Sequence, residues 1–192
     1  MSSPNFLAFA GSLRAASLNK KLVHVAADAA TAAGARVTVI DLRDFPLPVY
    51  DGDLEAAEGL PANARRLKDL FIAHQGLLIA CPEYNSSITA VLKNTIDWVS
   101  RQDGTESGTK PYEGKVAALF SASPGNFAAL RSLEATRGIL FQLGVLVVPQ
   151  RLAVPRAHQA FADDGTLREA TLQAALQAVV ASAIDTTARM NA

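Results

Sequence analysis

Residues 11–19 gather side chains of the kinds that bind phosphate. The stretch reads GSLRAASLN, and it offers four hydrogen-bonding side chains, those of Ser12, Arg14, Ser17 and Asn19. An apolar run precedes the stretch and a helical pattern follows it, so the unpaired, partly positive N–H groups of a helix start would lie at the same place. Each charge-assisted hydrogen bond to an anion there would contribute about 1.5–3 kcal/mol. The alternative is that Ser17 only caps the helix while Arg14 stays in solvent.

Residues 82–88 form a second unusual stretch, PEYNSSI, directly after another apolar run. A tyrosine beside hydrogen-bonding side chains and backbone amides suits a flat ring with heteroatoms at its edge. The alternative is a polar loop whose tyrosine is partly packed.

A third stretch, residues 121–125, is rich in small residues and follows the next apolar run. These small residues would let the backbone approach a ligand closely, although an ordinary turn has the same composition.

No nucleophile or metal cluster accompanies these stretches. Cys81 is the single cysteine, and a tyrosine-phosphatase loop would require arginine where Ser87 stands, so Cys81 is expected to be a small buried hydrophobe. His24, His74 and His158 are scattered, with no pair at ligand spacing. The sequence therefore predicts no metal site.

Short apolar runs and helical patterns alternate along the chain. The runs do not alternate apolar with polar residues, which is typical of strands covered on both faces of a parallel sheet. They lie at residues 6–10, 37–40, 77–80, 116–120 and 145–148. Helices are expected over about 22–33, from Pro61 to 71, over 89–101 and 126–143, and from Thr166, where Glu169 would complete a capping box.

This order predicts an α/β fold with a doubly wound, five-stranded parallel sheet of order 2-1-3-4-5 and helices on both faces, as in flavodoxin. Ligands bind such sheets beyond the carboxyl ends of the strands, where the strand order reverses. That point lies between the first and third strands, so residues 11–19 and 82–88 should meet there.

Composition limits the protein class. The 192 residues fit one domain, 1–192, and 18 basic residues balance 18 acidic ones. A net charge of zero predicts no nucleic-acid or anionic-membrane partner, and no apolar run reaches the length of a membrane helix. No basic segment precedes the first apolar run, so we expect a cytoplasmic protein.

The predicted helix at 89–101 is apolar on two sides. Leu92, Ile96 and Val99 form one stripe, while Val91, Thr95 and Trp98 form another. A helix of this kind must be covered twice. We expect Trp98 to lie at a subunit interface, the alternative being that it packs under a loop of its own chain.

Taken together, GSLRAASLN and PEYNSSITAVLKNTIDWVSR resemble the NADPH-dependent FMN reductase family, which includes bacterial quinone, chromate and azo-dye reductases. The resemblance implies non-covalently bound FMN, NADPH or NADH as electron donor, and a homodimer or homotetramer. It implies that Ser12, Arg14, Ser17 and Asn19 hold the FMN phosphate. Residues 82–85 would run along the isoalloxazine ring, with Ser123 and Gly125 near it. Arg131 matches a position that in some relatives reaches toward the acceptor side of the flavin or toward a neighbouring subunit.

The implied activity is a double displacement, in which electrons pass from NAD(P)H through FMN to a quinone, flavin, azo compound or metal oxyanion. Relatives usually carry Pro-Gly where this chain has Thr89-Ala90, and often Gly-Gly where it has Ala128-Ala129. Substrate choice therefore does not transfer. The alternatives are a flavodoxin-type electron carrier, a flavin-binding module without NAD(P)H turnover, and a phosphate-ester hydrolase on the same fold, for which the chain has no nucleophile-plus-arginine loop.

Overall fold

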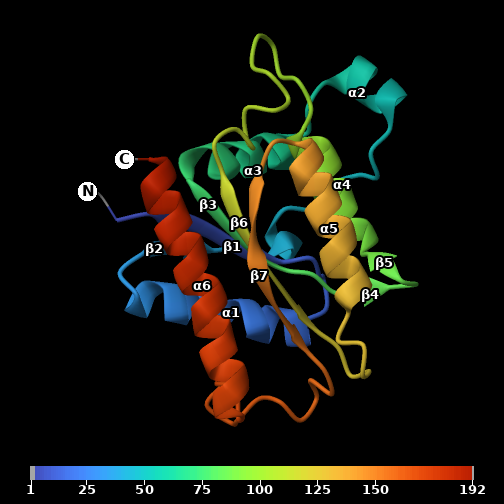
Figure 1. Cartoon of the computed structure of the whole chain (residues 1–192). Coiled ribbons are helices and arrows are strands. Elements are labelled where there is room, and N and C mark those ends of the chain that lie inside the picture. Colours follow the sequence, from blue (N-terminus) through green and yellow to red (C-terminus); the bar gives the residue numbers. More distant parts are fainter. Residues whose placement is uncertain (1–2, 192) are drawn as a thin grey trace.

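A parallel five-stranded sheet forms the centre of the protein (Figure 1). The computed structural model describes residues 3–191. The sheet order is β2-β1-β3-β6-β7, which is the order 2-1-3-4-5 when its strands are counted along the chain. The strands are β1 (Asn5–Ala10), β2 (Arg36–Val39), β3 (Gly76–Ala80), β6 (Val116–Ala122) and β7 (Leu146–Val154). Both the predicted order and the predicted strand positions are confirmed.

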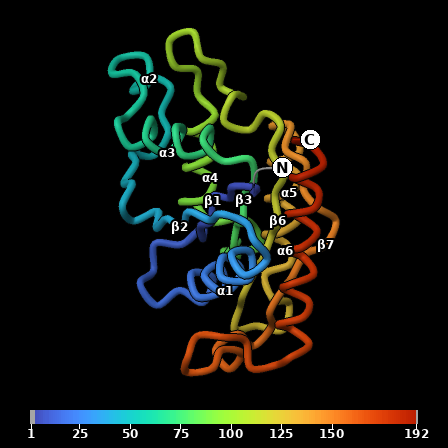
Figure 2. The backbone as a smooth tube through the Cα atoms, turned by 90° about the vertical axis from the view of Figure 1, so that its left-hand side faces the viewer, coloured from blue at the N-terminus to red at the C-terminus, as the bar shows by residue number. Residues whose placement is uncertain are grey.

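Helices cover both faces of the sheet (Figure 2). One face packs against α1 (Leu18–Ala32) and α6 (Ala170–Met190), and the other packs against α3 (Ala62–Ala73), α4 (Ala90–Val99) and α5 (Leu130–Gln142). Successive β1 residues alternate between the two cores, with Phe6 and Ala8 in the first and Leu7 and Phe9 in the second. Because both faces are buried, the strands read as continuous apolar runs.

Two helices begin later than the sequence predicts. Helix α6 starts at Ala170 rather than Thr166, because the backbone N–H and hydroxyl of Thr166 donate to Asp164 Oδ1 at 3.0 and 2.7 Å. Glu169 is the residue before the helix and makes no side-chain cap, so the predicted capping box is wrong. Helix α5 starts at Leu130 rather than at residue 126.

The long connection at residues 42–61 folds back over α4. It contains a 3-10 turn, η1 (Leu42–Asp44), and a short helix, α2 (Gly52–Glu58). Trp98 Nε1 donates to the Pro48 carbonyl at 2.9 Å, and the Trp98 side chain is fully buried. The Asn94 amide adds a bond to the same carbonyl and accepts one from the Tyr50 N–H, both at 2.8 Å. The predicted subunit interface at Trp98 is therefore wrong, because its own chain covers it.

Lys115, just before β6, is a buried base at the end of the sheet remote from residues 11–19. It is 4% exposed, and its ammonium group donates to the carbonyl of His74, whose ring is also buried. Burial, followed by repulsion from Lys110, lowers the pKa of Lys115 to about 8. The folded state thus disfavours the charged form relative to the unfolded chain.

The stability of the protein should consequently rise with pH through this group. Between the folded pKa of about 8 and the unfolded value of 10.5, the unfolded chain binds more protons than the folded protein. We expect the difference in unfolding free energy between wild type and Lys115→Met to move in favour of wild type by about 2–3 kcal/mol from pH 7 to pH 10. Urea unfolding of both proteins across this range measures it, and a constant difference would contradict it.

Candidate functional site

Three loops meet beyond the carboxyl ends of β1, β3 and β6. A pocket between them is lined by every predicted cofactor-binding residue except Asn85 and Gly125. These two still lie on the loops that form the pocket, at residues 81–89 and 123–129. The structure thus brings the first two stretches together at the reversal of strand order, and adds the third beside them.

The first loop ends at the amino terminus of α1. Ser17 is the N-cap and its hydroxyl accepts the Lys20 N–H at 3.4 Å, while the Ser12 hydroxyl accepts the Arg14 N–H at 3.2 Å. Both serines are buried, and Arg14 is exposed. Within residues 3–191, the backbone N–H groups of Ser17, Leu18 and Asn19 have no hydrogen-bond partner. Unpaired donors beside an arginine and two serines are a set that fits a phosphate.

Asn19 is placed at this loop, but its side chain already has partners. Its Nδ2 donates to the Ala122 carbonyl at 2.8 Å and its Oδ1 accepts the Ala122 N–H at 3.0 Å. The residue is 4% exposed, so Asn19 fastens the start of α1 to the end of β6. Its predicted direct contact with phosphate stays a prediction, whereas its role in fixing two of the three loops is evident.

The second loop is a tight hairpin of β4 (Glu83–Tyr84) and β5 (Ser87–Ile88). Asn85 and Ser86 connect its strands with φ of 50° and 66°, as a type I′ turn requires, and asparagine is one of the residues that tolerates this conformation. Tyr84 next to the turn is 52% exposed and free to offer a ring face.

Thr89 ties the second loop to the first. Its hydroxyl donates to the Gly11 carbonyl at 2.7 Å and accepts the Leu92 N–H at 3.3 Å, capping α4. A side chain at Gly11 would place its Cβ 2.8 Å from the Cβ of Leu92, so the loop passes against α4 only because residue 11 is glycine. In the sequence, Thr89 stands out only as a departure from relatives. The signal that it joins the loops was the capping preference of threonine before a helix.

Glu83 and Arg131 join the second loop to α5. The Glu83 carboxylate accepts the Arg131 guanidinium at 2.8 Å and the Arg131 backbone N–H at 3.1 Å. Ser132 Oγ donates to the Pro82 carbonyl at 2.7 Å. Arg131 therefore lies at the same edge as the predicted ring-binding residues.

The third loop turns sharply before α5. Ser123 Oγ accepts the Gly125 N–H at 3.2 Å, and Ser121 Oγ donates to the Ala128 carbonyl at 2.5 Å. Ala128 and Ala129 have φ of 52° and 63°, a left-handed conformation that favours glycine. This pair explains why α5 cannot begin at residue 126, and it coincides with the position where relatives carry Gly-Gly.

We expect Ala129→Gly to leave the unfolding free energy unchanged or to raise it by up to about 1 kcal/mol. Relief of the left-handed strain at residue 129 offsets both the loss of packing by the methyl group and the added entropy of the unfolded chain. The matched control is Ala135→Gly inside α5, which should lower the unfolding free energy by about 1 kcal/mol. Thermal denaturation of both variants tests the contrast in sign. Equal losses of stability would show that residue 129 is not strained.

Cys81 lies at the end of β3 and is fully buried. Burial raises the pKa of its thiol to about 12, as expected for a packed hydrophobe and not for a nucleophile. Among residues 3–191, no three His, Cys, Asp or Glu side chains are grouped so that they could hold a metal ion. The helices of that same range include none that is long and apolar enough to span a membrane.

A wider groove lies between α1, the 162–166 loop and α6. Lys21, His24 and Gln173 are among the residues that line it. None of the predicted site residues does so, and the groove lacks the convergence of three loops that defines the first pocket.

Comparison with protein families matches residues 4–159 to the model described as NADPH-dependent FMN reductase. An NAD(P)H-dependent FMN reductase of Pseudomonas aeruginosa is 35% identical over 163 residues, covering 84% of this chain and 83% of that protein. A quinone reductase of Escherichia coli K12 is 33% identical over 138 residues, covering 72% and 70%. Among solved structures, the flavoenzyme NAD(P)H:(acceptor) oxidoreductase FerB of Paracoccus denitrificans superposes with a TM-score of 0.81 at 30% identity, covering 97% and 98% of the two chains.

Proposed function

The chain belongs to the NADPH-dependent FMN reductase family, and from this premise we propose that it is an oxidoreductase that transfers two electrons from NAD(P)H through bound FMN to a small acceptor. The observation that carries the proposal is the meeting of the three loops at the carboxyl edge of the sheet, with unpaired N–H groups at the start of α1. Acceptors of the quinone, flavin, azo-compound and metal-oxyanion classes are all consistent with family membership.

In this proposal, Ser12, Arg14, Ser17 and the first N–H groups of α1 bind the phosphate of FMN. Asn19 holds α1 and β6 in the spacing that this requires. Pro82, Glu83, Tyr84 and Asn85 line the isoalloxazine ring, and Ser123 and Gly125 approach it from the third loop. When bound, FMN would supply hydride uptake from NAD(P)H and delivery of two electrons to the acceptor. The protein would anchor and orient the flavin and leave one face of its ring accessible. The proposed double displacement then needs no protein nucleophile.

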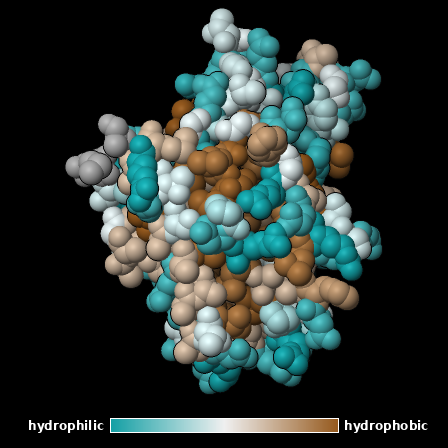
Figure 3. All heavy atoms as spheres, viewed as in Figure 1, coloured by the Kyte–Doolittle hydropathy of each residue, from teal (hydrophilic) through white to brown (hydrophobic). Residues whose placement is uncertain are grey.

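We also propose that residues 1–192 act as one domain within a homo-oligomer. Support for a partner copy comes from β7, which is the last strand of the sheet. Exposed apolar side chains lie beside it, with Phe141 on α5 at 77% exposure and Leu146 on β7 at 49%. Figure 3 shows a hydrophobic patch at the centre of this face. Sedimentation analysis would distinguish a dimer from a tetramer, and a monomer would contradict this part of the proposal.

The deciding experiment is a visible spectrum of the purified protein before and after NADPH is added without oxygen. A yellow protein that bleaches within seconds supports a reductase. Bound flavin that stays oxidised favours the alternative of an electron carrier or binding module. A colourless protein that does not take up added FMN contradicts the proposal.

A further inference from the structure

The Glu83 carboxylate fills a position where a helix normally uses its own capping residue. Helix α5 has Ala129 as N-cap and no side-chain cap of its own. Glu83, 48 residues earlier, accepts the Arg131 N–H at 3.1 Å and the Ser132 N–H at 3.4 Å. Its side chain is only 14% exposed, so it lies between the second loop and the positive end of the helix.

The same carboxylate forms an ion pair with the Arg131 guanidinium. Arg131 Nη1 lies 2.8 Å from Glu83 Oε1 and 3.1 Å from Ser86 Oγ. The guanidinium carbon is 5.2 Å from the centre of the Phe127 ring, in cation–π geometry. Although Arg131 is half exposed, its charge is thus balanced by a carboxylate and covered on one side by an aromatic ring.

We propose that Glu83 determines which acceptors the enzyme prefers, by neutralising Arg131 so that uncharged planar acceptors are favoured over anionic ones. The inference rests on the proposed function and concerns the part of the same site beside the predicted ring-binding residues. Glu83 lines the pocket directly, and its partner Arg131 borders the pocket through Glu83 and Ser86.

The surroundings of the pair match an uncharged, flat ligand. Tyr84 and Phe127, on the second and third loops, are 52% and 70% exposed, and aromatic faces bind planar rings by stacking. An anion near Arg131 would approach the Glu83 carboxylate as well, so attraction and repulsion would largely cancel. Two other basic side chains belong to these surroundings. Arg14 lines the pocket from the first loop, and Arg156 lies beside the third loop, where its backbone N–H donates to the Gly125 carbonyl at 3.4 Å.

Glu83→Gln is the direct test, because glutamine keeps an oxygen that can cap α5 while it removes the charge. The quantity measured is the ratio of kcat/KM for 1,2-naphthoquinone-4-sulfonate to kcat/KM for 1,2-naphthoquinone. We expect this ratio to rise about fivefold or more at low ionic strength and to fall back at high salt. The double variant Glu83→Gln/Arg131→Gln should lose the gain. Arg14 and Arg156 are present in every variant, so their effects cancel when the ratios of the variants are compared.

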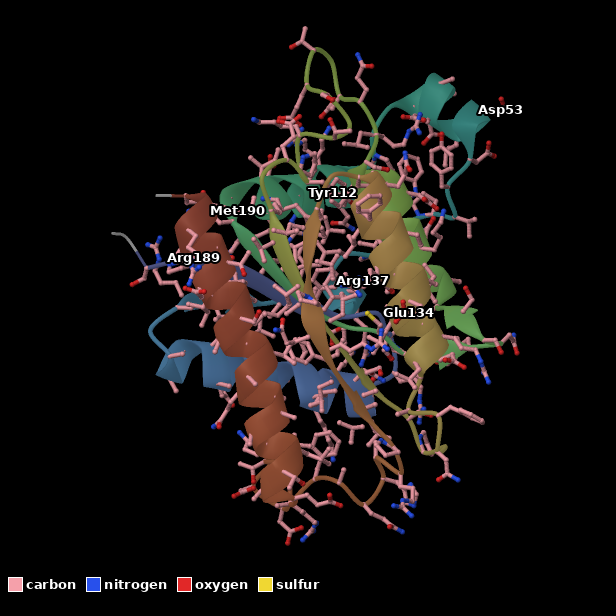
Figure 4. The ribbon with its side chains drawn as sticks, in the orientation of Figure 1. Asp53, Tyr112, Glu134, Arg137, Arg189 and Met190 are labelled. Carbon is pink, nitrogen blue, oxygen red and sulfur yellow. The ribbon has the colours of Figure 1, made fainter. Side chains whose placement is uncertain are left out.

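Glu134→Gln is the matched control. Glu134 lies one turn further along α5 and pairs with Arg151 of β7, on the side of the helix that faces β7 (Figure 4). The Glu134→Gln variant also removes one negative charge from a carboxylate–arginine pair, here a pair with a 53% exposed carboxylate, and the acceptor ratio should not change. An equal rise in both variants would show a general effect of net charge and would overturn the proposal.

A binding measurement separates this inference from the proposed function. Calorimetric titration with anthraquinone-2-sulfonate without NADPH should show about fivefold tighter binding to Glu83→Gln than to wild type, and no gain in the double variant. Unchanged binding in Glu83→Gln would overturn the role of Glu83, even in a protein that NADPH bleaches. Conversely, a tighter-binding variant of a protein that NADPH does not bleach would contradict the reductase function while leaving the charge compensation intact.

Discussion

Replacing Arg14 with methionine should weaken FMN binding by about 10- to 100-fold, with little change in the stability of the protein without flavin. The loss corresponds to one charge-assisted interaction with phosphate, about 1.5–3 kcal/mol. Stability should be unaffected because the Arg14 side chain is exposed and its guanidinium makes no hydrogen bond within residues 3–191. Titration of flavin-free protein with FMN, followed by the quenching of flavin fluorescence, measures the affinity.

Two further variants define the result. Arg14→Lys should recover part of the affinity, since a lysine keeps the charge but not the planar fork of donors. Arg189→Met is the matched control, because Arg189 lies in the last turn of α6, at the opposite end of the molecule from the three loops (Figure 4). Wild-type affinity in Arg14→Met would contradict the assignment of residues 11–19 to phosphate binding.

Replacing Asn19 with alanine should lower the unfolding free energy by about 2–4 kcal/mol, because the N–H and the carbonyl of Ala122 would both lose their buried partners. For a chain of this length, a loss of that size lowers the melting temperature by about 5–12 °C. Thermal denaturation without FMN measures it directly, so that a change in flavin binding does not enter.

Asn63→Ala serves as the control for Asn19. The Asn63 amide also donates to a backbone carbonyl, that of Pro46 at 3.0 Å, but in an exposed position where water can replace it. We expect a loss below about 1 kcal/mol there. If Asn19→Ala kept wild-type stability and lost FMN affinity instead, Asn19 would be a phosphate ligand rather than the link between α1 and β6.

The sheet was predictable because its burial is two-sided. Both faces of β1, β3 and β6 are covered, so each strand leaves an uninterrupted apolar run in the sequence. Once the strand order was inferred, the position of the site followed from topology alone, and the residues of the first two stretches indeed line one pocket.

The errors arise where the contacts that form differ from those that local patterns predict, and in two of the three cases these contacts are distant in sequence. Thr166 and Glu169 have capping-box spacing, but Asp164 binds Thr166 first. Helix α5 is capped by Glu83 from another loop, which no local pattern around residues 126–130 could indicate. The second stripe on α4 did predict a cover, but the pattern could not distinguish the chain's own loop from a second subunit.

The burial of Trp98 also provides an intrinsic fluorescence probe. It is the single tryptophan in the chain, and its indole N–H is bonded to Pro48 of the loop that folds over α4. Indole emission depends on contact with water, so detachment of this loop would be visible as a red shift before the sheet unfolds. The fluorescence of the unlabelled protein can thus follow the local opening of residues 42–61 separately from global denaturation.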